Sequence, residues 1–195
     1  MVDIMEYSQI GSIEMIVGPM YAGKSEELLR RVNRAKIAGL KVLLFKPGID
    51  DRYTLDSVAC HSGKTMKCVP VESAKEVREY IKDAAYDVLA IDEVQFLGED
   101  IIEVCKEAAD SGKRVICSGL DMDFKGGAFQ IVPEIMAIAE QVTKLTAICM
   151  VCKKPATRTQ RLVNGQPAKY SDPIIMVGAE ESYEARCRRC HEVRV

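Results

Sequence analysis

The stretch GPMYAGKSEELLRR, from Gly18 to Arg31, has the pattern of a phosphate-binding loop that runs into a helix. Its first eight residues match G-x-x-x-x-G-K-[ST] at every fixed position, and the apolar run Ile13–Val17 precedes them. In such a loop, backbone N–H groups point at phosphate oxygens, and the positive end of the following helix adds to the attraction. Lys24 would reach the β- and γ-phosphates, and the hydroxyl of Ser25 would hold Mg²⁺. The pattern predicts that a nucleoside triphosphate binds, but it does not indicate the fate of the γ-phosphate.

Apolar runs and helical spacings alternate along the rest of the chain. The expected strands are Ile13–Val17, Val42–Phe45, Val88–Ile91, a strand that starts at Arg114–Cys117, and Val142–Ile148. The expected helices are Lys24–Ala38 with Gly39 as its C-cap, Ala74–Ala84, Glu99–Ala109 and Ile131–Ala139, and a loop is expected at Ser118–Gly127. Strands that alternate with helices predict an α/β fold: a P-loop, RecA-like parallel sheet with helices on both faces.

The run VLAIDE, Val88 to Glu93, predicts an apolar strand with two carboxylates at its C-terminal end. In open α/β sheets, ligands bind at that edge. In P-loop proteins the acid that ends such a strand holds magnesium, which here predicts a metal role for Asp92. Side chains alternate along a strand, so Glu93 need not share the metal site and could accept a proton from an attacking hydroxyl or water. Without the phosphate loop, this Asp-Glu pair would be interpreted as an ordinary solvated strand end.

The eight cysteines fall into two groups. Cys60, Cys68, Cys105 and Cys117 are scattered, and we interpret them as small buried hydrophobic residues. The others form two C-x-x-C pairs, which together can complete a tetrahedral zinc site: Cys149 with Cys152, and Cys187 with Cys190. Four thiolates leave no open coordination position, so this zinc would be structural.

Other uses of these cysteines compete with zinc. Two disulfides are disfavoured if the protein is cytoplasmic. Cys187 to His191 also matches the C-x-x-C-H pattern of haem attachment, but that interpretation leaves the first pair without a role. His191 could also replace Cys190 as a zinc ligand, which we consider the less favoured assignment.

A change in charge accompanies the cysteine pairs. Residues 149–195 contain nine Lys or Arg and five Asp or Glu, which gives this part a net charge of +4. Because the whole chain has a net charge of −2, the first 148 residues have a net charge of −6. We therefore expect a P-loop domain at 1–148 and a zinc-binding lobe at 149–195. The segment Lys153–Arg186 has the composition of a long loop pinned at both ends by zinc, and long loops in compact proteins are usually functional. We expect it to be a lid over the substrate.

Composition excludes several classes of protein. No apolar run reaches the roughly 18 residues needed to span a bilayer. The first residues, MVDIMEYSQIGS, lack the basic and apolar regions of a signal peptide, so a cytoplasmic protein is expected. The small net charge predicts no global attraction to nucleic acid or to an anionic membrane.

Taken together, these motifs resemble thymidine kinase of the cytosolic type that many bacteria and animal cells share. The residues that carry the resemblance are GPMYAGKS, Asp50-Asp-Arg52-Tyr53, IDEVQF, Leu120-Asp-Met-Asp-Phe124, KLTAICMVC and the closing cysteine pair. They extend from about residue 12 to residue 191. The set is far more specific than the phosphate loop alone.

The resemblance implies a reaction, a site and an assembly. The γ-phosphoryl of ATP would pass to the 5′-hydroxyl of thymidine, as in nucleoside salvage for DNA synthesis. Glu93 would be the catalytic base, and a structural zinc would anchor the lid, called the lasso. The usual assembly of the family is a homotetramer, with thymidine triphosphate as feedback inhibitor. ATP would contact Gly18, Pro19, Met20, Tyr21, Ala22, Gly23, Lys24, Ser25, Asp92, Glu93, Val94 and Gln95, and thymidine would contact Met20, Asp50, Arg52, Phe96, Leu120, Phe124, Thr159, Ile174, Met176, Gly178 and Tyr183.

Three competing functions are weaker. A nucleic-acid-binding ATPase would combine the same phosphate loop with a basic zinc ribbon, but the balance of +4 is modest and no pattern of stacking aromatic and basic residues accompanies it. A GTPase would need a guanine-reading sequence such as N-K-x-D, which the chain lacks. A kinase for deoxyuridine or deoxycytidine differs from a thymidine kinase too little for the sequence to separate them.

Overall fold

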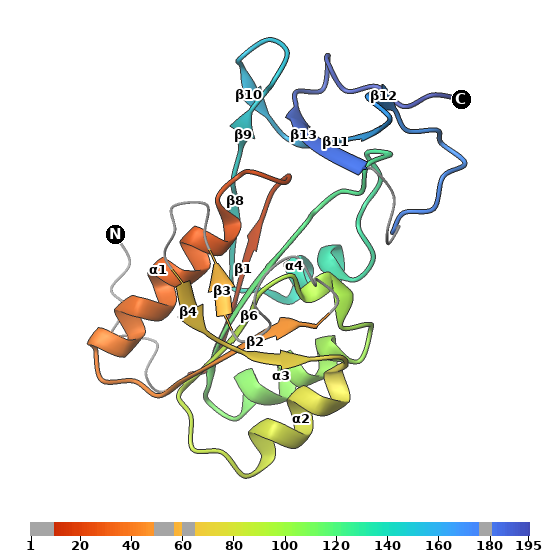
Figure 1. The fold of residues 1–195 in the computed structure, drawn as a ribbon. Helices are drawn as coiled ribbons and strands as arrows, with labels where there is room; N and C mark the ends of the chain where they lie inside the picture. Colours follow the sequence, from red (N-terminus) through yellow and green to blue (C-terminus); the bar gives the residue numbers. More distant parts are fainter. Residues whose placement is uncertain (1–9, 49–56, 60–64, 176–180) are drawn as a thin grey trace.

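A six-stranded parallel sheet forms the centre of the molecule (Figure 1). The structure, a computed structural model, describes residues 10–48, 57–59, 65–175 and 181–195. Along the sheet the strands follow the order β5-β2-β6-β7-β1-β8. Their bounds are β1 Ser12–Val17, β2 Val42–Pro47, β5 Val69–Val71, β6 Val88–Ile91, β7 Arg114–Gly119 and β8 Gln141–Lys144.

Helices cover both faces of this sheet, as predicted. The helices are α1 Lys24–Ile37, α2 Ala74–Lys82, α3 Ile101–Asp110 and α4 Val132–Ile138. One hydrophobic cluster joins α1 to the sheet, where Leu28 and Val32 meet Ile16. A second cluster joins the other three helices to the opposite face, where Val77, Ile101 and Ile135 meet Met15. Successive residues of β1 thus enter different cores, which explains why its sequence is continuously apolar.

The helix that follows the phosphate loop ends at the predicted glycine. Gly39 has a φ of 80°, and the N–H groups of Gly39 and Leu40 donate to the carbonyls of Lys36 and Ala35, each at 3.0 Å. This pair of bonds is a Schellman motif, which satisfies carbonyls that the end of a helix leaves open. The 14-residue length of α1 is therefore encoded locally.

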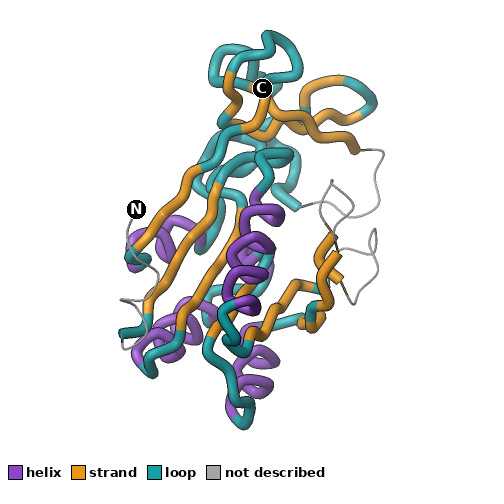
Figure 2. Tube along the Cα trace, turned by 90° about the vertical axis from the view of Figure 1, so that its left-hand side faces the viewer, coloured by secondary structure: helices purple, strands orange, loops and turns teal. Residues whose placement is uncertain are grey.

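The described residues from Ala147 onward form what we call the cysteine lobe. It lies beyond the carboxyl ends of the central strands, as Figures 1 and 2 both show. A hydrophobic cluster of Ala147, Cys149, Ala156 and Ala185 forms its centre, and Ala22 of the phosphate loop packs against this cluster. Two small antiparallel sheets build the lobe: β9 Ala147–Ile148 with β10 Pro155–Ala156, and β11 Arg158–Val163 between β12 Gln166–Pro167 and β13 Glu181–Arg186.

Two predictions about this region were wrong. Val142–Ile148 is not one strand, because β8 ends at Lys144 and pairs with β1, whereas β9 pairs with β10. The segment Lys153–Arg186 is not one long loop, because residues 158–163 pair in register with residues 181–186. Antiparallel pairing thus places these two stretches in a sheet rather than in a loop.

The remaining elements differ from the predictions mainly at their ends. Ser118 and Gly119, predicted to start a loop, are the last residues of β7. Helix α3 starts two residues later than expected. The short strands β5, β3 Ser57–Ala59 and β4 Thr65–Lys67 were not predicted. Within the described ranges, no helix combines the length and apolar character that crossing a membrane requires.

Candidate active site

The phosphate loop joins the end of β1 to the start of α1 at the carboxyl edge of the sheet. Gly18 has a φ of 151°, and a Cβ atom there would lie 2.6 Å from the carbonyl oxygen of Leu145. Tyr21 and Gly23 also have positive φ values, 65° and 81°, which curl the loop. Lys24 is 6% exposed, and its Nζ donates to the carbonyl of Pro19 at 3.1 Å. The loop is thus closed over its own lysine, and the first N–H groups of α1 have no partners within the helix.

Asp92 at the end of β6 faces this loop. Its Oδ2 atom accepts a hydrogen bond from Ser25 Oγ at 2.9 Å, and its Oδ1 accepts another from Ser118 Oγ. The carboxyl is 2% exposed, and burial together with the charge of Glu93 raises its pKa. The hydroxyl and the carboxylate present hard oxygen donors, the ligand type that Mg²⁺ takes. The two residues predicted to hold magnesium therefore lie together and fit that ion.

Glu93 departs from the strand geometry that precedes it. It has a φ of 49° and a ψ of 45°, a left-handed conformation that is uncommon outside glycine. The side chain of Gln95 donates from Nε2 to Glu93 Oε2 at 2.5 Å. Unusual backbone conformations of this kind cluster at functional sites. The turn and the amide together fix the direction of the Glu93 carboxylate.

The next residues form a 3₁₀ turn, η2 Val94–Phe96. Its side chains are buried to different degrees. Val94 lies fully buried in the core, and Gln95 is 1% exposed. A Cβ at Gly119 would lie 2.6 Å from Gln95 Oε1, so the end of β7 needs glycine to admit this amide. A contact of Val94 or Gln95 with ATP would therefore have to come from the backbone, and the side-chain role of Gln95 toward Glu93 was not foreseen.

The residues predicted around the pyrimidine come from three segments at the same edge. Met20 lies in the phosphate loop, Phe96 ends η2, and Leu120 and Phe124 follow β7. Phe96 is half-buried and meets the ring of Phe129 edge to face, with 6.3 Å between centroids. Phe124 is buried, and the guanidinium carbon of Arg161 lies 5.0 Å from its ring centroid.

Three of the predicted thymidine-contacting residues that the structure describes lie in the cysteine lobe: Thr159, Ile174 and Tyr183. Thr159 in β11 is 3% exposed, and its Oγ1 accepts a hydrogen bond from the backbone N–H of Met20 at 3.0 Å. This hydroxyl therefore contacts the phosphate loop itself. Ile174 is exposed, and Tyr183 is half-buried in β13. Four predicted residues lie outside the described residues: Asp50, Arg52, Met176 and Gly178.

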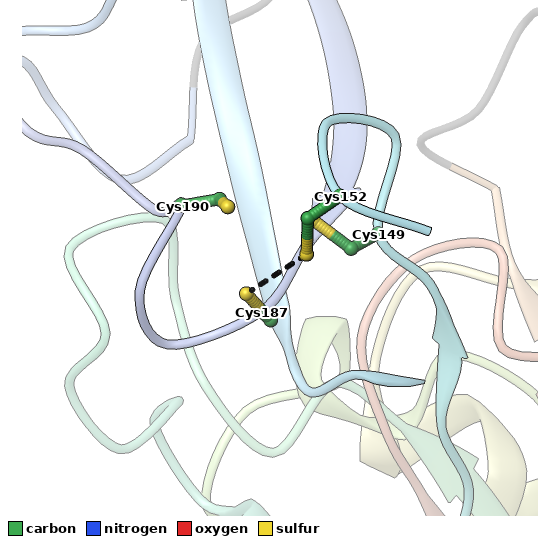
Figure 3. Close-up of side chains that lie close together, drawn as sticks. All are labelled: Cys149, Cys152, Cys187 and Cys190. Atoms are coloured by element: carbon green, nitrogen blue, oxygen red, sulfur yellow. Dashed lines mark hydrogen bonds between the residues drawn. The ribbon is translucent and has the colours of Figure 1, made fainter. Parts of the chain in front are cut away.

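The four paired cysteines converge on one point (Figure 3). Their Sγ atoms all lie within 4.8 Å of one another, and Cys152 and Cys187 are 3.6 Å apart. Zn–S bonds of about 2.3 Å in a tetrahedron place sulfurs about 3.8 Å apart, so the cluster fits zinc. The backbone N–H of Cys152 lowers the pKa of Cys149 to about 6, and the backbone N–H of Cys190 lowers the pKa of Cys187. The hydrogen bond with Cys187 raises the pKa of Cys190 to about 12, so this thiol would lose its proton on binding zinc, which takes thiolates.

His191 does not join this cluster. Its Nε2 lies 2.8 Å from the backbone carbonyl oxygen of Phe124. The structure thus brings Cys190, not His191, to the other three sulfurs. Arg161 was also missed as a site residue: it is fully buried, and its Nη1 donates to the carbonyl of Pro173 at 2.6 Å. A charged residue in a polar run such as RTQRLV gives no sequence signal for burial.

Known proteins resemble this chain in fold and in sequence. The flagellar accessory protein FlaH from Methanocaldococcus jannaschii has the same fold, with a TM-score of 0.50 at 16% identity over 78% of this chain and 80% of that one. Two more distant structures also match. The Legionella pneumophila ATPase DotB matches with a TM-score of 0.46 at 15% identity, over 78% of this chain and 45% of that one. A DNA replication initiation factor matches with a TM-score of 0.41 at 18% identity, over 71% of this chain and 41% of that one, so this chain spans less than half of each. A family model described as thymidine kinase matches residues 11–191, which include the phosphate loop, Asp92-Glu93 and both cysteine pairs. The chain therefore belongs to the thymidine kinase family.

Proposed function

We propose that this protein is an ATP-dependent thymidine kinase, which forms thymidine monophosphate and ADP. The observation that carries the proposal is the arrangement at the end of β6, combined with the family match. Asp92 is engaged with Ser25 of the phosphate loop, whereas the adjacent Glu93 leaves the strand geometry and is oriented by Gln95. One strand end thus offers two carboxylates in different environments, as a kinase that needs a metal acid and a base requires.

The groups around the phosphate loop would neutralise the negative charge of the ATP phosphates. Lys24 and the backbone N–H groups of the loop and of the first turn of α1 would bind the β- and γ-phosphates. Bound Mg²⁺ would be held by Ser25 and Asp92, and it would offset the negative charge of the phosphates. These groups supply the positioning and electrostatic stabilisation on which phosphoryl transfer mainly depends.

Glu93 would act on the acceptor. Its carboxylate accepts the proton of the 5′-hydroxyl of thymidine while that oxygen attacks the γ-phosphorus. The bond from the γ-phosphorus to the bridging oxygen breaks, and ADP leaves with the negative charge. A fixed carboxylate favours this step because the base must lie within hydrogen-bond reach of the hydroxyl.

Apolar and aromatic side chains would surround the thymine ring. We propose that Met20, Phe96, Leu120 and Phe124 enclose it, since flat apolar ligands are bound mainly by such side chains with a few polar groups at the edge. The segment between β12 and β13, which contains Ile174, Met176 and Gly178, would close as the lid with Tyr183 at its end. Asp50 and Arg52 would complete the sugar and phosphate contacts. Closure would exclude water that otherwise hydrolyses ATP.

Other features of the proposal rest on the sequence patterns described above and, for the assembly and the inhibitor, on the family resemblance. We propose a cytoplasmic homotetramer with a structural zinc, inhibited by thymidine triphosphate, and a division into units at 1–148 and 149–195. None of the four zinc ligands would take part in chemistry, because a tetrahedral Cys₄ site has no open position.

Product analysis with γ-labelled ATP tests the function. The purified protein is incubated with thymidine, deoxyuridine, deoxycytidine or no nucleoside, and the labelled products are separated. We expect label in thymidine monophosphate at the highest rate. If single-stranded DNA stimulates release of labelled phosphate while thymidine has no effect, the protein is a nucleic-acid-dependent ATPase and the proposal is wrong.

A further inference from the structure

The loop that carries Phe124 is held by hydrogen bonds within its tip, by an ion pair between Asp121 and Lys144 of β8 at 2.6 Å, and by contacts with the cysteine lobe. We call residues 120–130 the acceptor loop. Within it, Asp123 Oδ1 accepts hydrogen bonds from the N–H groups of Lys125 and Gly127, each at 2.9 Å. The N–H of Asp123 in turn donates to the carbonyl of Gly127, also at 2.9 Å. These contacts fix the turn at its tip, but they do not fix the place of the turn relative to the phosphate loop.

The cysteine lobe contacts the acceptor loop at several points, and three of these contacts lie at or next to Phe124. His191 Nε2 lies 2.8 Å from the carbonyl oxygen of Phe124. The Arg161 guanidinium lies over the ring of the same residue. Arg158 lies so close to Gly126 that a Cβ there would be 2.3 Å from Nη1. The lobe thus holds both the backbone and the ring of Phe124 from the side away from the central sheet.

Chemistry determines the direction of the His191 bond. A carbonyl oxygen can only accept, so Nε2 must carry the hydrogen and donate it. Among the described residues this bond joins the lobe to the backbone of Phe124. A donor at this position therefore sets where the main chain of the loop passes.

The position of His191 is itself tied to the cysteine site. The N–H groups of Cys190 and His191 both donate to the carbonyl of Cys187, at 3.1 and 3.0 Å. The following residue is held on its other side: Gln160, fully buried in β11, donates to the carbonyl of Glu192 and accepts from its N–H, each at 2.8 Å. The imidazole thus projects from a short segment that is fixed at both ends.

We propose that His191 is a positioning residue for the nucleoside pocket, which transmits the geometry of the zinc-binding turn to the backbone of Phe124. The zinc site would then influence nucleoside binding through the position of Phe124 as well as through the lid. The inference rests on the proposed function, because it assigns the pocket next to Phe124 to the nucleoside. It predicts that loss of the imidazole donor weakens binding of the nucleoside and leaves binding of ATP unaffected.

Two substitutions separate the hydrogen bond from the space that the ring fills. His191→Phe keeps a ring but has no donor, whereas His191→Gln keeps an N–H that can reach the same carbonyl. Arg189→Ala is the matched control, since this exposed residue lies in the same turn between Cys187 and Cys190. For each protein, KM for thymidine, KM for ATP, kcat and the zinc content per chain are measured.

We expect His191→Phe to raise KM for thymidine about 5- to 20-fold, the usual effect of an unsatisfied buried carbonyl. KM for ATP and zinc content should stay within twofold, His191→Gln should recover most of the affinity, and Arg189→Ala should match wild type. An unchanged KM for thymidine, zinc loss, or an equal rise in both KM values without rescue would overturn the inference. A wild-type protein that fails to phosphorylate thymidine would instead overturn the proposed function.

Discussion

Gln95 donates a hydrogen bond to Glu93 across a single intervening residue, with 2.5 Å between Nε2 and Oε2. The amide is buried, and Glu93 has a left-handed backbone conformation. The carboxylate is therefore held by the chain on one side and by the amide on the other. This geometry distinguishes Glu93 from Asp92, whose oxygens accept hydrogen bonds from Ser25 and Ser118.

Replacement of Glu93 tests its role as base. Glu93→Gln keeps the size and a hydrogen-bonding carbonyl but cannot accept the proton of the 5′-hydroxyl. We expect kcat to fall roughly 10²- to 10⁴-fold, with both KM values within a few-fold of wild type, measured by steady-state kinetics. Glu99→Gln, the same change at an exposed site nearby, should have no effect. A kcat within a factor of a few of wild type would remove Glu93 from this role.

Replacement of Gln95 tests whether the amide acts through Glu93. Among the described residues, Gln95 Oε1 has no hydrogen-bond partner, so Gln95→Leu should cost little stability. We expect kcat to fall about tenfold because the carboxylate loses its orientation. The sharper measurement is a double-mutant cycle: in a Glu93→Gln background, Gln95→Leu should lower kcat no further. Additive losses would show that the two residues act independently.

The central sheet could largely be predicted from sequence, for a physical reason. Strand β6 has the predicted bounds, Val88–Ile91, because it is buried on both faces and therefore reads as an unbroken apolar run. The phosphate loop was equally clear, since positions such as Gly18 and Gly23 need backbone conformations that glycine adopts easily. The edge strand β5 was missed because it has only three residues and contains Pro70.

The cysteine lobe was less predictable because its structure depends on partners that are distant in sequence. Gln160 and Arg161 are fully buried in β11, although their residue types are usually exposed. Their burial is stabilised by the backbone of Glu192 and by the carbonyl of Pro173. Nothing in the local pattern indicates such partners. For the same reason, Val142–Ile148 was read as one strand, although its two halves pair with different neighbours.

Thr159 links the lobe to the phosphate loop, and its hydroxyl can be tested separately from its methyl group. Thr159→Val removes the acceptor for the Met20 N–H, whereas Thr159→Ser keeps it. We expect Thr159→Val to raise the Kd for ATP about 3- to 10-fold, since an unsatisfied N–H disturbs the loop, and Thr159→Ser to stay near wild type. Calorimetric titration with a non-hydrolysable ATP analogue measures this. If the serine variant loses affinity and the valine variant keeps it, the methyl group is the important part.

Removal of zinc tests the structural role of the cysteine cluster. Cys152→Ser removes one of four sulfurs that lie within 4.8 Å of one another. We expect loss of bound zinc, a lower Tm, and a rise in KM for thymidine of at least tenfold, because the lid and the acceptor loop both depend on the lobe. Met150→Ser alters an exposed residue in the same turn and should keep metal and activity. Zinc loss with unchanged affinity for thymidine would contradict the link between metal and pocket.

Acid sensitivity of the fold can be tested at Glu27 on α1. Its carboxylate accepts hydrogen bonds from Arg30 at 2.6 and 2.8 Å and from Arg31 at 2.8 Å. The Arg30 hydrogen bond is the largest influence, and together these contacts lower the pKa of Glu27 from 4.5 to about 2 despite partial burial. A lowered folded-state pKa stabilises the protein above the unfolded pKa, and this stability is lost as the pH falls through the folded one.

We therefore expect Glu27→Gln to lower the free energy of unfolding by about 1 kcal/mol at pH 7, a value that allows for solvent screening of these partly exposed charges. The difference between wild type and variant should be constant from pH 7 to about pH 5.5, and it should shrink as the pH falls from about 4.5 toward 2. Urea unfolding followed by circular dichroism at several pH values measures it. Glu79→Gln, at an exposed site on α2 whose nearest lysine nitrogen is 3.8 Å away, should give almost no difference at any pH. A difference for Glu27→Gln that grows on acidification would show that the carboxylate is not the group stabilised by Arg30 and Arg31.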